Sequence, residues 1–516
     1  MADVAAMMQA GERAVAAGQW GEARKWFSKV VARHENPAAL VHLSYLESKT
    51  GSYRRACDFA VRAFRIRKHP GPLRLKVLNR LRHFNQTWAL HSFIEGTSDW
   101  ERMDPRELHA FAAQASYLGS QQRAIQLLDL ALRKQPASPP LLLARAQIRT
   151  FLGQFDEAEE DLQACMGQTR DMAAIWWTLA RLRKQTHDSN HVDDLRRELG
   201  RQRPASERAF LQFALHKELD DLGDIPGASE ALTAGCATKR SEISYSTGQS
   251  RSLMALLKSS TEAVPVPEHG ADLGFTPIFI VGMFRSGTTL LEQLLGGNAR
   301  MLNAGELYDF GTSMRYAADH QTSGFIDEEL ISRAGAIDFG EVAAQYVKGV
   351  KWRLQAGQTH LTDKLPANFY NVGYILRALP QARILHMVRD PVETCFSNLR
   401  ELFSGASPYS YDQGELADFY LMYEDLMAHW HRQYPGRVLD IHYSDLTTRT
   451  EEVMRKVAAH CGLDFLPTMV DPRSNAQSVA TASAVQVRSP VIARAVPKWE
   501  PYRGYLQPLI HRLGRG

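Results

Sequence analysis

A short pattern of apolar and small residues recurs along the first half of the chain. A turn glycine is followed two positions later, in most copies, by a bulky apolar residue and five positions later by alanine, and successive copies are 33 or 34 residues apart, or about twice that. The glycines are Gly18, Gly51, Gly119, Gly153 and Gly223. Such a period predicts stacked helix–turn–helix units, in which the alanines let paired helices approach closely. Two intervening units, near residues 86–88 and 187–188, lack the glycine and are predicted to be degenerate.

The hydrophobic pattern changes in the second half. Residues 239–275 are polar and punctuated by proline and glycine, which predicts a boundary. Beyond them, short β-rich apolar runs at 277–283, 360–364, 383–388 and 437–443 alternate with helical stretches. This alternation predicts a parallel α/β sheet with crossover helices. The expected fold is therefore an all-α repeat domain over residues 1–238, a linker over 239–275 and an α/β domain over 276–516.

Composition narrows the functional classes. The chain has 516 residues, of which 44% are hydrophobic and 23% charged, so a largely disordered protein is not expected. The net charge of +4 is concentrated in residues 486–516, which hold six basic side chains and one acidic one. The rest of the chain sums to about zero, which disfavours nucleic-acid binding. We expect the last basic residues, Arg512 and Arg515, to be solvated, whereas Arg488 has a local use.

The spacing of the cysteines and the sequence of the amino terminus indicate the cellular compartment of the protein. The five cysteines are scattered, with no CxxC pair and no Cys/His cluster, so neither a disulfide framework nor a metal site is expected. The amino terminus lacks a basic region followed by an apolar core, and no apolar run is long enough to span a membrane. These features predict a cytoplasmic protein with no membrane span.

The strongest chemical signal is the sequence TPIFIVGMFRSGTTLLEQLL, which starts at residue 276. It predicts a strand, a tight loop and a helix start, an arrangement that directs backbone N–H groups and a helix dipole toward an anion. The expected anion-binding residues are Arg285, Ser286, Gly287, Thr288 and Thr289. Gly282 and Gly287 have the spacing of a Walker A loop, but Thr288 stands where a nucleotide triphosphatase needs lysine. The motif therefore disfavours ATP hydrolysis.

A second motif lies at the end of a later strand. Arg389 follows the run RILHMV, and the Asp-Pro pair after it predicts a helix start that places Ser397 about two turns into a helix. Ligands of open α/β sheets bind at the carboxyl ends of strands, and the planar guanidinium of Arg389 is suited to a phosphate.

Together, RSGTT and the Arg389–Ser397 pair resemble the sulfotransferase superfamily over residues 276–513. The repeat-then-transferase order resembles tetratricopeptide-repeat sulfotransferases and, more distantly, tyrosylprotein sulfotransferases. The resemblance implies that the loop binds the 5′ end of 3′-phosphoadenosine 5′-phosphosulfate (PAPS), that Arg389 and Ser397 bind the 3′-phosphate, and that no metal takes part. Phe284 departs from the family, which usually has proline there.

The resemblance also implies catalytic roles. Glu306, in AGEL, would be the base, and Lys364, in TDKLPAN, would stabilise the leaving group with help from Arg285. Tyr443 would lie at the nucleotide, and a loop around residues 478–491 would contribute Arg488 and the hydroxyl of Ser483 or of Thr481. His360 and His386 are rival bases, although His386 lies inside an apolar strand and fits a hydrogen-bonded core histidine better.

The sequence therefore favours a PAPS-dependent sulfotransferase whose repeats recognise the acceptor or a protein partner. A peptide or protein acceptor, such as a tyrosine, is the first hypothesis, and a small molecule stays open. Two alternatives remain: a P-loop nucleotide kinase or other phosphotransferase, and an inactive repeat scaffold.

Overall fold

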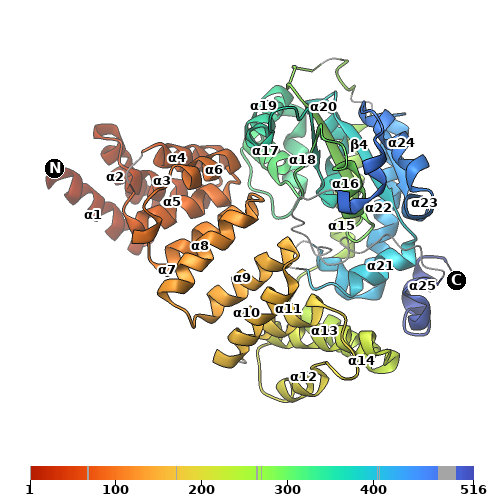
Figure 1. Ribbon diagram of the computed structural model, residues 1–516. Coiled ribbons are helices and arrows are strands. Elements are labelled where there is room, and N and C mark those ends of the chain that lie inside the picture. The colour runs from red at the N-terminus through yellow and green to blue at the C-terminus, as the bar shows by residue number, and fades with distance from the viewer. Residues whose placement is uncertain are drawn as a thin grey trace. The chain divides into compact units, whose positions relative to one another are not determined.

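The computed structural model describes residues 2–66, 69–169, 171–262, 265–268, 270–403, 405, 407–474 and 496–515. The chain forms two compact units (Figure 1). The first comprises Met1–Gln135, Tyr308–Leu354 and Arg377–Leu379, and the second comprises Pro136–Leu307, Gln355–Leu376 and Pro380–Gly516.

The first unit contains helix pairs built on the predicted repeat. The helices are α1 (Ala2–Ala16), α2 (Trp20–Arg33), α3 (Pro37–Lys49), α4 (Tyr53–Arg65), α5 (Gly71–His83), α6 (Thr87–Glu95), α7 (Pro105–Tyr117) and α8 (Gln121–Lys134). Gly18, Gly51 and Gly119 turn between paired helices at φ of 70°, 83° and 88°, a conformation that glycine adopts without a steric penalty. In the degenerate copy, Asn85 makes the same turn at φ of 48°. Asparagine tolerates this region better than most residues, so the repeat continues there.

A segment from the second half of the sequence also belongs to this unit. It carries α17 (Asp309–Ala317), α18 (Glu328–Arg333) and α19 (Phe339–Val350), of which α17 packs on α4 and α19 on α6. The hydroxyl of Thr87 lies 2.7 Å from the carbonyl oxygen of Gly349 and 3.0 Å from Asp309 Oδ1. Arg54 lies 2.6 Å from Glu341. The repeat helices thus bury a crossover segment that begins two residues after Glu306.

The second unit holds the later repeats. Its helices are α9 (Pro139–Leu152), α10 (Phe155–Gln168), α11 (Ala173–Leu182), α12 (Val192–Leu199), α13 (Ala205–Leu222) and α14 (Ile225–Ser241). Gly153 and Gly223 turn at φ of 80° and 81°. The segment expected to be a linker contains α15 (Thr247–Thr261), which packs on α22 (Gln413–Gln433). The predicted domain limits differ from the limits of the compact units, because α14 packs on the turn Pro408–Tyr411 and α15 packs on α22.

The sheet of the second unit has five parallel strands in the order β2-β3-β1-β4-β5. The strands are β1 (Thr276–Gly282), β2 (Met301–Asn303), β3 (His360–Asp363), β4 (Arg383–Val388) and β5 (Val438–His442). Four of them match the predicted apolar runs, which confirms the predicted α/β fold. The strand β2 was not predicted, because three residues are too short to show a pattern.

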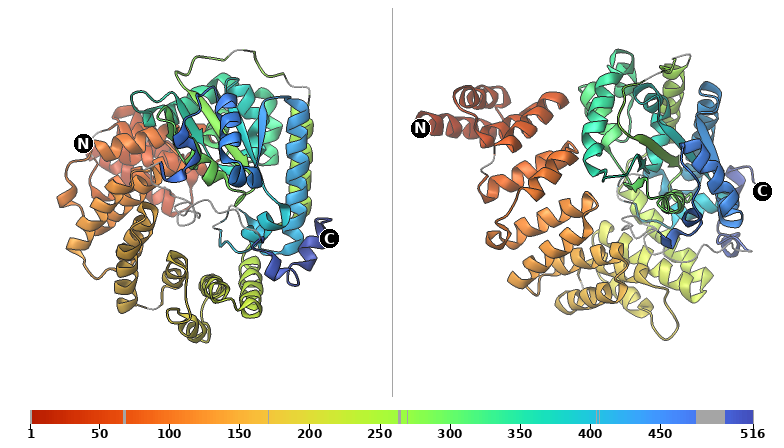
Figure 2. Two further views of the ribbon diagram at one scale, coloured as in Figure 1. Left: turned by 45° about the vertical axis from the view of Figure 1, so that its right-hand side comes forward. Right: turned by 45° about the horizontal axis from the view of Figure 1, so that its top comes forward.

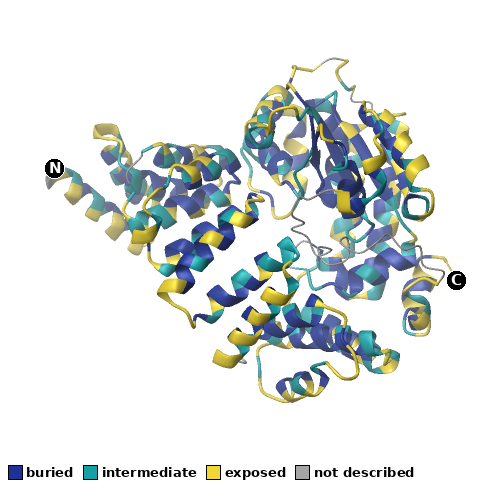
Figure 3. Cartoon of the chain, viewed as in Figure 1, coloured by how far each residue is buried: buried dark blue, intermediate teal, exposed yellow. Residues whose placement is uncertain are grey.

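Helices cover both faces of the sheet (Figure 2). On one face, α16 (Thr288–Leu295) and α24 (Thr450–Cys461) share a core with Ile278, Ile280 and Leu385. On the other face, Tyr423 and Trp430 of α22 reach β4 and the turn after β3. The remaining α-helices are α20 (Val372–Ala378), α21 (Pro391–Leu399), α23 (Tyr443–Thr448) and α25 (Gln507–Arg512). Burial on both faces explains why the central strands β1 and β4 are mostly apolar runs (Figure 3).

The carboxyl-terminal helix is packed, whereas its last arginines are exposed. Leu509 and Ile510 of α25 are buried, and α25 packs on α22. Arg512 is 2.6 Å from Asp418, Arg515 lies near Glu424, and the two arginine side chains are 57% and 55% exposed. These arginines are therefore solvated as expected, on a helix that the buried leucine and isoleucine hold against α22. Among the described residues, no helix is both long and apolar enough to cross a membrane.

The Thr87 contact predicts how the first unit is held together. In Thr87→Val, the Asp309 carboxylate and the Gly349 carbonyl lose a buried donor, which should cost roughly 1–3 kcal/mol. Amides of α17 and α19 should therefore exchange with deuterium about tenfold faster or more. Thr97→Val is the matched control, since that hydroxyl bonds to the carbonyl of Phe93 four residues earlier. Equal exchange in the two variants would contradict the role given to Thr87.

Candidate active site

The predicted site residues meet at the carboxyl edge of the sheet. The phosphate loop follows β1, Glu306 follows β2, Lys364 follows β3, Arg389 follows β4 and Tyr443 follows β5. Because the strands are parallel, their carboxyl ends lie at one edge, which is where ligands of open α/β sheets bind. The topology thus brings together five segments that are as far as 160 residues apart in the sequence.

The phosphate loop has a tightly constrained backbone. Gly282 and Gly287 have φ of 152° and 107°, and Arg285 itself has φ of 67°. A Cβ atom at Gly287 would lie 2.5 Å from Tyr443 Cδ2, and one at Gly282 would lie 2.9 Å from the carbonyl oxygen of Met387. The absence of a side chain at these two glycines therefore lets Met387 of β4 and Tyr443, which follows β5, pack directly against the loop. Helix α16 begins directly after Gly287, so its first N–H groups border the loop.

Arg389 is in contact with this loop. Its Nη1 donates to the carbonyl oxygen of Arg285 at 2.9 Å, its Nη2 donates to Glu393 at 2.9 Å, and its guanidinium stacks 4.5 Å from the centre of the Tyr443 ring. Ser397 lies half-buried on the same helix as Glu393. The two sequence motifs therefore meet through Arg389, and the Tyr443 ring lies against both Arg389 and the position of Gly287.

Several buried polar atoms around this site lack hydrogen-bond partners among the described residues. The donors Ser286 Oγ and Arg389 Nε are among them, as is the acceptor Glu393 Oε2. Buried polar atoms in proteins are nearly always satisfied, so unsatisfied ones beside a phosphate loop indicate a place for ligand oxygens.

Glu306 and Lys364 form an ion pair next to the loop. Lys364 Nζ lies 2.9 Å from Glu306 Oε1; the lysine side chain has no solvent exposure, whereas the glutamate side chain is 32% exposed. The backbone N–H of Lys364 also donates to the carbonyl of Gly305 at 2.9 Å. Solvent can therefore reach the Glu306 carboxylate, whereas the Lys364 ammonium lies on its buried side.

Sequence reasoning missed Glu292, a third charged group here. Its Oε1 accepts hydrogen bonds from the backbone N–H of Gly305 at 2.9 Å and from Thr362 Oγ1 at 2.7 Å. Burial raises the pKa of Glu292, and the positive charge of Lys364 opposes that rise. Glu292 thus holds the loop that presents Glu306. The available signal was a charged residue on a helix, TTLLEQLL, whose other residues are mostly apolar.

The rival bases lie elsewhere. His360 begins β3, at the opposite edge of the sheet, and its ring contacts Thr359 and the carbonyl of Cys461. It does not reach the site, because one strand length separates the two edges. His386 is buried in mid-strand, where it bonds to Asp440 and to the hydroxyl of Tyr423, so it is the core histidine that its sequence context favoured.

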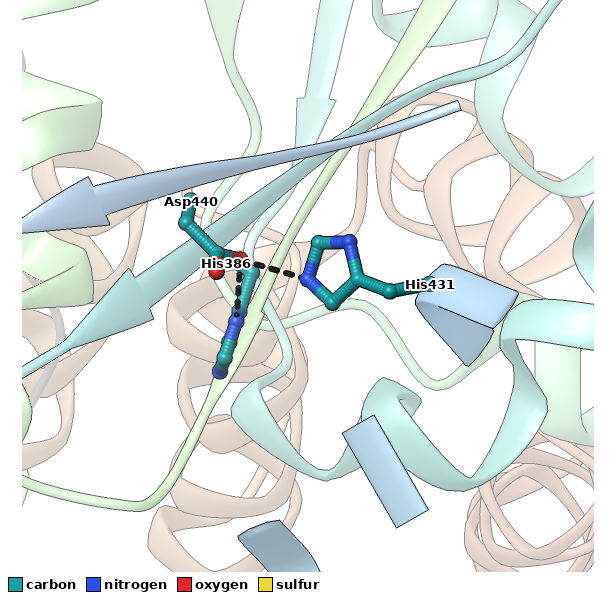
Figure 4. Close-up of side chains that lie close together, drawn as sticks. All are labelled: His386, His431 and Asp440. Carbon is teal, nitrogen blue, oxygen red and sulfur yellow. Dashed lines mark hydrogen bonds and ion pairs between the residues drawn. The ribbon is translucent and has the colours of Figure 1, made fainter. Parts of the chain in front are cut away.

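His386, His431 and Asp440 place three possible metal-ligating atoms within 4.8 Å of one another (Figure 4). Each histidine is 2.8 Å from Asp440 Oδ1. Burial lowers the pKa of His386. Burial alone would raise the pKa of Asp440, but its hydrogen bonds and the nearby histidines hold that pKa below its usual value. The contacts are those of a hydrogen-bond network in which both histidines bond to the Asp440 carboxylate. Neither Glu306 nor Lys364 belongs to this network.

Two predicted contacts cannot be placed. Ser483 and Arg488 lie outside the described residues, as does the rest of the loop around residues 478–491. Their roles stay predictions. The five cysteines are all buried and form no disulfide.

The geometry of Gly287 predicts a large effect of a methyl group. Gly287→Ala should lower the free energy of unfolding by roughly 1–3 kcal/mol, because its Cβ would overlap the Tyr443 ring in an already strained backbone. Gly167→Ala, at an exposed helical position with open space around it, should be neutral or stabilising. Urea denaturation of both variants measures the difference, and equal stabilities would contradict the packing described here.

Comparison with known proteins shows what the part of the chain around this site is similar to. Residues 277–467 match the model of the sulfotransferase family. An uncharacterized protein of Aquifex aeolicus is 28% identical over 442 residues, which cover 82% of this chain and 57% of that protein. The chain thus spans little more than half the length of that relative.

Solved structures give looser likenesses. The sulfotransferase domain of the Synechococcus PCC 7002 olefin synthase is 18% identical and covers 47% of this chain and 97% of its own, with a TM-score of 0.31. The C-terminal part of a TPR repeat-containing protein from Cytophaga hutchinsonii is 12% identical and covers 45% of this chain and 95% of its own, also with a TM-score of 0.31. The residues that match the sulfotransferase family model include the phosphate loop, Glu306, Lys364, Arg389 and Tyr443. The C-terminal half of the chain therefore contains a region, residues 277–467, that matches the sulfotransferase family.

Proposed function

We propose that this protein transfers a sulfuryl group from PAPS to a hydroxyl acceptor. The observation that carries the proposal is the ion pair of Glu306 and the buried Lys364, which lies at the same sheet edge as the phosphate loop. This arrangement supplies a base and a cation beside an anion site, as sulfuryl transfer requires.

The donor would bind along the loop and Arg389. The N–H groups at the start of α16, together with Ser286, Arg285 and the hydroxyls of Thr288 and Thr289, would hold the 5′-phosphosulfate. Arg389 and Ser397 would hold the 3′-phosphate. The unpartnered Ser286 Oγ and Arg389 Nε support this fit, because ligand oxygens would satisfy both.

PAPS, when bound, supplies a sulfuryl group activated by its bond to a phosphate oxygen. Glu306 would accept the proton of the acceptor hydroxyl as the new oxygen–sulfur bond forms. Lys364 would then stabilise the phosphate oxygen released as the old bond breaks, leaving 3′,5′-adenosine bisphosphate. Arg285 would offset negative charge on the transferring group, and no metal is required.

The structure weighs against an ATP-dependent phosphotransferase. Thr288 occupies the position of the Walker lysine. The acidic residue nearest to a Walker B position is Asp363 at the end of β3, but it accepts a hydrogen bond from Asn368. Its neighbour Thr362 contacts Glu292 of α16, and since successive strand residues face opposite ways, Asp363 points away from α16.

The acceptor belongs to the proposal as well. A peptide or protein hydroxyl, such as tyrosine, suits a repeat array, and a small molecule is the other possibility. A screen with labelled PAPS against both classes would decide. A cytoplasmic location stays a prediction from the sequence.

Nucleotide binding tests the donor. In calorimetry, 3′,5′-adenosine bisphosphate should bind at least tenfold more tightly than AMP or ATP, and Arg389→Ala should abolish that preference by removing the 3′-phosphate contact. Arg383→Ala, at the amino end of the same strand, is the control and should bind like the unaltered protein. A preference for ATP would overturn the proposal.

Rate measurements test the base. Glu306→Gln should slow transfer by a factor on the order of 10²–10⁴ while leaving affinity for 3′,5′-adenosine bisphosphate within a few-fold. The exposed Glu230→Gln serves as the control. A Glu306→Gln enzyme with an unaltered rate would exclude Glu306 as the base.

A further inference from the structure

Helix α11 of the repeat region reaches the phosphate loop through two charged side chains. Arg181, at the end of α11, lies 3.1 Å from Glu401 Oε1, and the other oxygen of Glu401 lies 3.9 Å from Arg285 Nη1 in the loop. All three residues belong to the second compact unit. The order of charges from the repeat helix to the loop is therefore positive, negative, positive.

Glu401 is a confined charge. It follows α21 by two residues, its side chain is 9% exposed, and its backbone N–H donates to the carbonyl of Asn398. The preceding residue, Arg400, pairs with Asp220 and donates to His216, both on α13, so the repeat region fixes this segment at a second point. The backbone that carries this carboxylate is therefore held in place by its own N–H and by its neighbour Arg400.

Such a carboxylate has a defined effect on Arg285. The Arg285 side chain is 13% exposed, and burial lowers its pKa. Glu401 opposes that change, whereas the positive charges of Arg181, Arg389 and Arg400 add to it. Glu401 thus favours the charged form of Arg285, yet an uncompensated carboxylate there would also repel an anionic ligand of the loop.

We infer that Arg181 is a positioning residue of the donor site: by neutralising Glu401, it lets Arg285 present a net positive charge to the 5′-phosphate of the nucleotide. This inference rests on the proposed function. It makes the repeat region part of the donor site as well as a surface for acceptors or partners. The Arg181 guanidinium also stacks on the ring of Trp177, which lies on the same helix, at 4.7 Å from the ring centre. This cation–π contact restricts the position of the Arg181 side chain.

Whether Glu401→Gln restores the nucleotide affinity that Arg181→Ala loses distinguishes charge compensation from a merely structural role of Arg181. In Arg181→Ala, the negative charge of Glu401 is no longer offset by Arg181 and cancels more of the positive charge of Arg285. The affinity for 3′,5′-adenosine bisphosphate should therefore fall about tenfold. Glu401→Gln removes the repelling charge but keeps the side-chain shape. The double variant Arg181→Ala, Glu401→Gln should therefore recover to within about threefold of the unaltered protein.

Calorimetry on the full chain measures all of these variants. Arg183→Ala is the matched control, because Arg183 lies two residues away and pairs with Asp156 and Glu159 instead. Arg181→Lys should retain most of the affinity, and thermal unfolding checks that each variant folds. An affinity of Arg181→Ala within twofold of the unaltered protein would overturn the inference, as would a loss that Glu401→Gln fails to rescue. If the unaltered protein does not bind 3′,5′-adenosine bisphosphate, the proposed function itself fails.

Discussion

A fully buried ammonium group must be compensated, and Lys364 imposes that constraint on the carboxyl edge of the sheet. Its charge is matched by Glu306 at 2.9 Å, and it opposes the effect of burial, which raises the pKa of Glu292. Removing one partner of a buried pair leaves an uncompensated charge, which costs several kcal/mol. The turn that presents Glu306 is therefore held twice at Gly305: Glu292 accepts its N–H, and the backbone of Lys364 donates to its carbonyl. These contacts hold the Glu306 carboxylate in a partly exposed position.

The repeat region takes part in the same organisation. Its helices α11, α13 and α14 contact the end of α21 and the residues after it, through Arg181, Asp220 and Cys236. Since α21 follows Arg389 and carries Ser397, these contacts brace one wall of the proposed donor site. In the other compact unit, the crossover segment after Glu306 is buried against α4 and α6. Repeat helices therefore support segments that follow both Glu306 and Arg389, which gives a physical reason for joining repeats and transferase in one chain.

Most of the fold could be predicted because its signals are local. Glycine at a positive φ marks each predicted repeat turn, and a strand buried on both faces reads as an apolar run. The failures have equally local causes. Asn85 replaces glycine at a turn without a distinctive signal, β2 is too short to show a pattern, and α15 is polar enough to look like a linker. The compact units could not be predicted, because they depend on contacts between segments far apart in the sequence.

For the site, the sequence alone determined which residue types follow each strand: the glycines and arginine of the loop, Glu306, Lys364, Arg389 and Tyr443. A parallel sheet brings strand ends to one edge, so these residues were bound to converge if the fold was right. Tertiary structure decided which of them touch. It paired Glu306 with Lys364, assigned His360 to the far edge, and revealed Glu292 and Glu401 as buried charges. Burial and pairing arise when segments from distant parts of the chain exclude water together, and no single stretch of sequence records that.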